Sequence, residues 1–374
     1  MKQFFIKLAT LVGIVLFLSL FFRLFFPKLF IKDVYNAKMV AFDEQKSELD
    51  VVMLGTSRTT FGISPSTFSK KIFTDTKQKW NAFSCGMAGA SLGETVALCK
   101  KMIKDKDFKG KYILFELTSV TSTVSDRFCG EKNLHTNRNV YWMDFDMLKF
   151  SNSLIWSENT GKWSFWEKIH FSKNFCVHYI HNVFNVSMFE DALKIVMSSK
   201  ILSDYGYDKH GFQPLEDKKT KKRNAKQLNK WINKKLKPML KSKYEINEQI
   251  FSPNSPKYPL NESYYHQLTE LIEMGKQAGK NVIFFAPPLL YKKSAREIQA
   301  VYQKMPEKNK LQFVGGSEYA KLYDVKNVYD EIHLNGKGAE IYSVLVAEKM
   351  AEKFLPQKNK KRAKALKKEQ SSIK

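Results

Sequence analysis

The chain has 374 residues, a hydrophobic content of 43% and a formal net charge of +25. This length and composition exclude a wholly disordered chain and fit one large α/β domain or a domain with a sizeable insertion. Residues 218–243 and 358–374 carry 19 of the 25 net charges, so the rest of the protein is only mildly basic. Because no helix-turn-helix, RRM or KH pattern accompanies the charge, we expect no nucleic-acid partner.

The amino-terminal segment 1–32 is predicted to be a membrane anchor. Residues 4–26 are almost entirely apolar, and roughly 20 such residues span a bilayer. No small-x-small cleavage site follows the apolar core, which favours an uncleaved single-pass anchor over a signal peptide. Basic residues flank both ends of the run, so charge counting leaves its orientation open.

The next part of the chain alternates short apolar runs with helical patterns. Strands are predicted at 50–54, 80–83 and 111–117, with helices over 65–73 and from Ser91 toward Lys104. Ser91 and Glu94 have the spacing of a capping box, which indicates where the second helix begins. The repeated order of strand, turn and helix predicts a parallel sheet.

From about 120 to 262 this alternation is lost, which indicates an insertion. Its first part is rich in aromatic residues, for which we expect core packing more than glycan stacking or a membrane surface. The turn-rich stretch 205–214 contains His210, which could face a substrate or lie in a surface turn. Residues 218–243 place Leu228, Trp231, Ile232 and Leu236 at helical spacing among lysines, a pattern that fits a solvated basic helix or a surface for anionic lipid or polymer.

The alternation returns after the insertion. We predict helices over 263–278, 294–305 and 338–354, strands at 281–286 and 311–314, and a strand end just before Asp330. The α/β domain is thus expected to span 48–356. The basic tail at 357–374 is predicted to be disordered.

The four cysteines, Cys85, Cys99, Cys129 and Cys176, lack the spacing of a zinc site, so no metal is expected. Two disulfides are possible in an oxidising compartment. Cys85 and Cys99 fit better as small buried hydrophobic residues.

Two distant segments carry residues suited to acyl transfer. The first is Gly55-Thr-Ser57-Arg58, directly after the strand at 50–54, and the second is Asp330-Glu-Ile-His333-Leu-Asn-Gly-Lys-Gly338. A Gly-x-Ser turn alone is more often a simple helix cap. Together, however, the segments provide a serine, a base and an acid to orient that base, each at or after a predicted strand end.

With these two motifs the chain resembles the SGNH (GDSL-like) hydrolase superfamily. The turn at Ser57 is similar to its first block, and the segment from Asp330 is similar to its last block, D-x-x-H-L-N-x-x-G. The likeness covers about 48–119 and 263–354. It is greatest to the membrane-anchored envelope branch of the DltD and AlgJ/AlgX types, whose members act in teichoic acid D-alanylation and alginate O-acetylation.

The resemblance implies a three-layer αβα, flavodoxin-like parallel sheet with a large insertion. It also implies roles: Ser57 as nucleophile, His333 as base and Asp330 as its partner. The backbone N–H groups of Ser57 and of Gly86 or Gly89 would form the oxyanion hole. At the third block the chain departs from the family, with Thr118 and Ser119 near the strand end where an asparagine is expected, so that the hydroxyl of Thr118 or of Ser119 becomes a candidate donor. From its position next to Ser57, Arg58 could steer an anionic or acylated glycan, or it could form a surface ion pair.

These observations predict a membrane-tethered serine O-acyltransferase or esterase that acts on an envelope polysaccharide or another acylated polymer without a cofactor. The catalytic domain is expected on the extracytoplasmic side of the cytoplasmic membrane. A multi-spanning membrane O-acyltransferase is an expected partner. The alternative is a catalytically inactive scaffold, or a subunit that binds polymer or lipid within an envelope polysaccharide machinery.

Overall fold

The computed structural model describes residues 1–25, 33–120, 138–157, 163–184, 201–215, 230–252, 254–311 and 317–354. The chain divides into two compact units. One contains residues 1–37 and 121–201, and the other contains residues 38–120 and 202–374. The predicted tail at 357–374, Cys129 and residues 218–229 lie outside the described residues.

The second unit is built on a parallel sheet of four strands in the order β2-β1-β3-β4. The strands are β1 (Val51–Leu54), β2 (Ala82–Ser84), β3 (Tyr112–Glu116) and β4 (Asn281–Phe285). All three pairings are parallel. Continuous burial along β1 and β2 shows why these strands read as unbroken apolar runs, as parallel strands covered on both faces do. The predicted α/β class with a parallel sheet is therefore confirmed.

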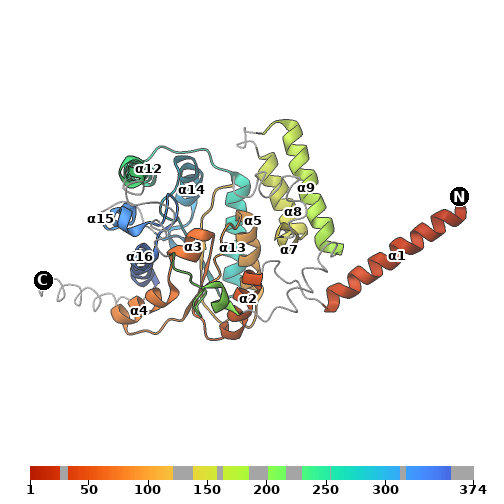
Figure 1. Ribbon diagram of the computed structural model, residues 1–374, viewed down its shortest axis with the longest axis horizontal. Coiled ribbons are helices and arrows are strands. Elements are labelled where there is room, and N and C mark those ends of the chain that lie inside the picture. Colours follow the sequence, from red (N-terminus) through yellow and green to blue (C-terminus); the bar gives the residue numbers. More distant parts are fainter. Residues whose placement is uncertain are drawn as a thin grey trace, which may run out of the picture. The chain divides into compact units, whose positions relative to one another are not determined.

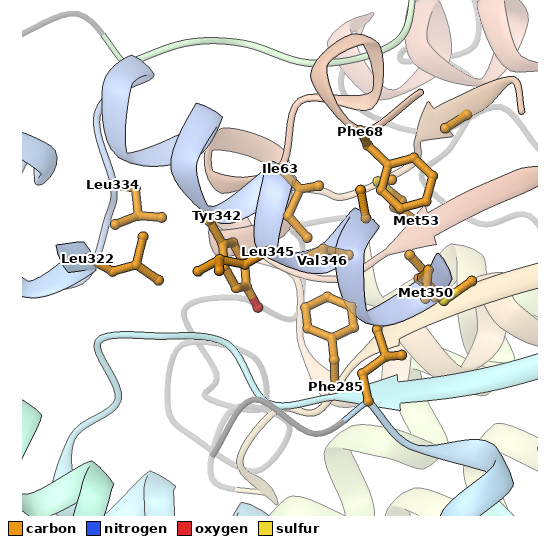
Figure 2. Packing of buried hydrophobic residues seen from close by; sticks show 14 of the residues in the cluster. Met53, Ile63, Phe68, Phe285, Leu322, Leu334, Tyr342, Leu345, Val346 and Met350 are labelled. Atoms are coloured by element: carbon orange, nitrogen blue, oxygen red, sulfur yellow. The ribbon is translucent and has the colours of Figure 1, made fainter. Parts of the chain in front are cut away.

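One face of the sheet is covered by α4 (Pro65–Thr76) and α16 (Gly336–Phe354), which pack against each other. Figure 2 shows the resulting cluster, in which Met53 of β1 and Phe285 of β4 meet Phe68 of α4 and Val346 of α16. These four side chains are fully buried. Apolar burial of this kind is the main favourable term in folding, so this layer holds both helices on the sheet.

The other face carries α5 (Leu92–Lys104) and α13 (Glu262–Gln277), as Figure 1 shows. The predicted capping box at the start of α5 is confirmed. Ser91 accepts from the N–H of Glu94, and the Glu94 carboxylate accepts from the N–H of Ser91. This unit also contains the helices α12 (Lys237–Phe251) and α14 (Lys292–Lys304).

Several shorter elements of this unit differ from the sequence-based expectations. The 3₁₀ helix η9 (Val325–Asn327), which follows η8 (Lys321–Tyr323), stands where a strand was predicted to end before Asp330, so that prediction is wrong. Of the strand predicted at 311–314, only Leu311 is described, and its N–H donates to the carbonyl of Phe284. Two of the apolar positions of the predicted basic helix face the core: Leu236 is buried, and Trp231 packs against the same cluster.

In the first unit the described helices are α1 (Lys2–Phe25), α7 (Arg138–Trp142), α8 (Phe145–Trp156) and α9 (Phe165–Phe184). Within the described part of the chain, no helix has the length and apolar character that crossing a membrane requires. The prediction of core packing is confirmed for Tyr141, Trp142, Phe171 and Phe175, which are buried. It is wrong for Trp156, Phe165 and Trp166, which are exposed.

The helix α2 (Asp33–Gln45) contains residues that belong to both units. The cysteines Cys85 and Cys99 are buried and free, as expected for small hydrophobic residues, and Cys176 is free and exposed. Burial raises the pKa of the Cys85 thiol to about 12, which keeps it protonated at neutral pH.

Candidate active site

The turn after β1 presents Ser57 at the carboxyl end of the sheet. Thr56 has an extended backbone and caps the short helix α3 (Ser57–Gly62), its hydroxyl accepting from the N–H of Arg58. Ser57 is thus the first residue of α3. Open α/β sheets bind their ligands at this edge, so the turn that follows β1 places the serine where a ligand can reach it.

A second loop brings His333 to the same edge. Leu334, the next residue, is buried in the core cluster and forms an isolated antiparallel bridge with Val328. Asn335 then caps α16, because its side-chain oxygen accepts from the N–H of Gly338. A Cβ on Gly338 would lie 1.9 Å from the carbonyl oxygen of Asn327, so only glycine fits there. The motif from Asp330 to Gly338 is therefore one folded unit that fixes the imidazole.

Ser57, His333 and Asp330 meet in a linear chain of hydrogen bonds. His333 Nε2 lies 2.8 Å from Ser57 Oγ. His333 Nδ1 lies 2.9 Å from Asp330 Oδ2 and 3.0 Å from Oδ1. A carboxylate only accepts, so Nδ1 carries the proton and Nε2 accepts from the serine hydroxyl. This is the arrangement in which an imidazole can take the hydroxyl proton of a serine.

The charge on Asp330 is stabilised within this loop. Its Oδ1 also accepts from the N–H groups of Ile332 at 2.8 Å and His333 at 2.9 Å. Although partial burial raises the pKa of Asp330, the hydrogen bonds from the His333 ring and these backbone groups outweigh it and hold the pKa below its usual value. The carboxylate is therefore ionised at neutral pH and can stabilise a protonated imidazole.

Two further residues border the triad. The ring of Phe61 meets the ring of His333 edge-on, with centroids 5.8 Å apart, and so limits its rotation. The Arg58 side chain is mostly buried, and its Nη1 lies 4.0 Å from Glu116 Oε1. The predicted steering residue thus lies beside the triad with its guanidinium near a buried carboxylate.

The second glycine segment lies beside α3. A Cβ on Gly86 would come within 2.8 Å of the N–H nitrogen of Thr60, so the glycine permits a close approach to the helix that carries Ser57. Lys38 donates a 2.6 Å hydrogen bond to the Gly86 carbonyl, and the next N–H, of Met87, donates to the Gly55 carbonyl. Gly89 has φ +73° in the following turn. Gly86 is therefore held from two sides.

The backbone N–H and the hydroxyl of Thr118 donate hydrogen bonds to groups other than Ser57. The Thr118 N–H donates to the hydroxyl of the buried Tyr264 at 3.3 Å, and the Thr118 hydroxyl donates to the Glu116 carbonyl at 3.5 Å. Ser119 bonds to the Glu297 carboxylate. In this conformation neither residue offers a free side-chain donor toward Ser57.

His210 lies in a turn against the edge strand β2. Its carbonyl accepts from the N–H of Ser84, and its own N–H donates to Asp208. Partial burial lowers the pKa of its imidazole, so the ring is neutral at physiological pH. The same stretch reaches α3, since the N–H of Gln213 donates to the Thr60 carbonyl. The structure therefore gives His210 contacts within a turn, and none of these contacts involves the triad.

Sequence reasoning missed two residues that support the site. Glu116, the last residue of β3, binds Thr56, the residue before Ser57, and Thr59, the second residue after it. Lys243 of α12 donates to the carbonyls of Glu331 and Leu289 and lies over the Tyr291 ring. For Glu116 a signal was available, because an acidic residue ends an otherwise apolar strand. Lys243 is one lysine among many, so the sequence does not distinguish it.

No group of three or more His, Cys, Asp or Glu side chains within the described ranges could hold a metal ion. No protein-family model matches the chain, and no curated protein is significantly similar to it. The assignment of this site therefore rests on its geometry.

Proposed function

We propose that the protein is a serine esterase or O-acyltransferase that forms a covalent acyl ester on Ser57. The observation that carries this proposal is the hydrogen-bonded order Ser57 Oγ, His333 Nε2, His333 Nδ1 and Asp330 Oδ2, with contacts of 2.8 and 2.9 Å. The parallel sheet and the chain order of the three residues support an SGNH-like fold.

In the first half of the reaction, Ser57 Oγ attacks the carbonyl carbon of an acyl ester while His333 Nε2 takes the hydroxyl proton. The resulting oxyanion is stabilised by backbone N–H donors, for which we assign Ser57 and Gly86. When the bond to the leaving oxygen breaks, His333 returns its proton to that oxygen. The acyl group remains as an ester on Ser57.

In the second half, a hydroxyl group replaces the leaving group. His333 takes the proton of the incoming sugar hydroxyl or water as its oxygen attacks the acyl carbon, and then returns that proton to Ser57. The acceptor decides whether the enzyme is a transferase or an esterase. We assign as substrate an acylated envelope polysaccharide, and we retain the amino-terminal tether and a membrane O-acyltransferase partner as parts of this proposal.

A serine-directed fluorophosphonate tests the nucleophile without knowledge of the substrate. We expect the full chain to become labelled on Ser57, as located by peptide mass mapping. Ser57→Ala and His333→Ala should abolish the label. Ser66→Ala, on an exposed position of α4, is the matched control and should label normally. A folded wild-type protein that gives no label would refute the proposal.

Both hydrogen-bond donors of Thr118 already have partners within the protein. This observation favours one alternative function, a catalytically inactive scaffold. Removing one oxyanion donor costs on the order of 3 kcal/mol in barrier, so a site without a side-chain donor is slow or silent. Full complementation of a gene deletion by Ser57→Ala would establish the scaffold role. Loss of function with a folded variant would support the enzyme.

A further inference from the structure

Next to the triad, both oxygens of the Glu116 carboxylate accept hydrogen bonds. It is fully buried at the carboxyl end of β3. In the pairing of β1 with β3, Leu54 lies opposite Phe115, so Glu116 follows beside Gly55. A Cβ on Gly55 would lie 2.4 Å from Glu116 Oε2 and 2.2 Å from Thr59 Oγ1. The glycine of the Gly-x-Ser turn is therefore needed to admit this carboxylate.

Glu116 accepts four hydrogen bonds from the two threonines that flank Ser57. Oε2 accepts from the N–H of Thr56 at 2.9 Å, the N–H of Thr59 at 3.1 Å and the hydroxyl of Thr59 at 2.6 Å. Oε1 accepts from the hydroxyl of Thr56 at 2.7 Å. One side chain thus binds the residue before the nucleophile and the second residue after it. The N–H of Ser57 is not among the donors to this side chain.

This pattern differs from an ordinary helix cap. A cap residue lies next to its helix in the sequence and satisfies one or two N–H groups, whereas Glu116 lies 60 residues from Thr56 on another strand. Its four contacts fix the backbone that sets both the direction of Ser57 Oγ and the position of the Ser57 N–H.

We propose that Glu116 is a positioning residue that holds the Ser57 turn so that Oγ faces His333 and the Ser57 N–H remains available to the substrate. This inference rests on the proposed function for its catalytic consequence. It does not involve contact between Glu116 and the substrate. Its effect is exerted through Thr56 and Thr59.

Two variants separate the length of the side chain from its charge. Glu116→Asp keeps the charge but is one methylene shorter, so it cannot reach both N–H groups. Glu116→Gln keeps the length: its carbonyl can replace Oε2, and its amide can donate to the Thr56 hydroxyl. We expect Glu116→Asp to lower the rate constant for fluorophosphonate labelling of Ser57 by about 100-fold, since misplacement by about 1 Å has effects of that size. Glu116→Gln should stay within about tenfold of wild type.

Asp50 supplies a matched control at the opposite end of the same sheet. Its carboxylate also accepts a backbone N–H, from Asn81 at 2.8 Å. Asp50→Glu changes the side chain by one methylene far from Ser57 and should leave the labelling rate unchanged. Rates are compared per folded molecule, with folding checked by circular dichroism. If folded Glu116→Asp labels at the wild-type rate, the positioning role is wrong.

A second measurement does not depend on activity. The ring signals of His333 can be followed by NMR in protein with isotope-labelled histidine, with the exposed His266 as reference. Glu116→Asp should shift the His333 signals in the same direction as Ser57→Ala and leave those of His266 in place. Unchanged His333 signals would overturn the inference. If Glu116→Asp causes this shift but the wild-type protein gives no labelling, the proposed function alone is refuted.

Discussion

Lys243 donates a 2.6 Å hydrogen bond to the carbonyl oxygen of Glu331, which lies between Asp330 and His333. The same ammonium donates to the Leu289 carbonyl at 3.2 Å. It therefore joins α12, the loop after β4 and the acid–base loop. Burial, and next the positive charge of Arg58, lower the pKa of Lys243 to about 8. The basic segment at 218–243 thus contributes a buried structural contact as well as exposed lysines.

Lys243→Met should loosen the loop that carries His333. The change leaves one buried and one partly buried carbonyl oxygen without this donor, and leaving a buried group unsatisfied typically costs about 1 to 3 kcal/mol. We expect the free energy of unfolding to fall by roughly that amount and the labelling of Ser57 to slow. Urea denaturation and fluorophosphonate labelling measure the two effects.

Lys241→Met is the control for this variant, because Lys241 lies on the same helix with 79% of its side chain exposed. It should change the free energy of unfolding by no more than about 0.5 kcal/mol. Equal effects of the two substitutions would contradict the role of Lys243.

Lys38 should make stability depend on pH. It is buried, and burial lowers its pKa in the folded protein to about 7, against about 10.4 in an unfolded chain. Between these values the unfolded state binds more protons, so stability rises with pH. The gain should be of the order of 3 kcal/mol between pH 7 and 10.

The measurement is the free energy of unfolding of wild type and Lys38→Met across this pH range. Because other groups titrate in both proteins, the quantity compared is the difference between the two curves. The free energy of unfolding of wild type should increase relative to that of Lys38→Met as the pH rises. A constant difference would show that Lys38 stays charged in the folded protein and would refute this prediction.

Gly55→Ala should damage both the fold and the nucleophile. The added Cβ would lie within 2.4 Å of Thr59 Oγ1 and Glu116 Oε2, and overpacking of this kind typically costs about 1 to 3 kcal/mol. Because Glu116 must move, the labelling of Ser57 should fall even in the folded fraction. Thermal unfolding and labelling rates check the two parts of this prediction.

Gly62→Ala is the matched substitution in the same short helix. There the added Cβ would meet only Leu334 Cδ1, at 3.8 Å, an ordinary contact. We expect Gly62→Ala to be neutral or slightly stabilising, because alanine restricts the unfolded chain. A loss in Gly62→Ala as large as that in Gly55→Ala would mean that the clash with Glu116 is not the cause.

Asp330→Asn should slow the labelling of Ser57 by about 100-fold or more while the protein stays folded. An amide can donate to Nδ1, which favours the imidazole tautomer that cannot accept the serine proton. Asp324→Asn, at the N-cap of η9, replaces a nearby carboxylate that does not contact His333 and should label at the wild-type rate. Normal labelling of Asp330→Asn would refute the assigned tautomer.

Local patterns in the sequence predict much of the second unit. Strand β1, the Gly-x-Ser turn, the capping box at Ser91 and the segment from Asp330 to Gly338 each depend on a few neighbouring residues. Spacing therefore indicated them, and chain order indicated that Ser57 and His333 meet at one sheet edge. The strand predicted before Asp330 failed because η9 and the Asn327 carbonyl against Gly338 determine that turn, and these contacts are not periodic.

Only the tertiary structure decided how the site is supported. Glu116 binds Thr56 and Thr59, from which it is separated by 60 and 57 positions in the sequence. Lys38 binds Gly86, and Lys243 binds Glu331. In sequence these are one acid at a strand end and two ordinary lysines. Their roles follow from burial, because a buried charged group must find its partners wherever the fold brings them. The sequence alone thus indicated which groups could carry out acyl transfer, whereas the fold determined which groups hold them in place.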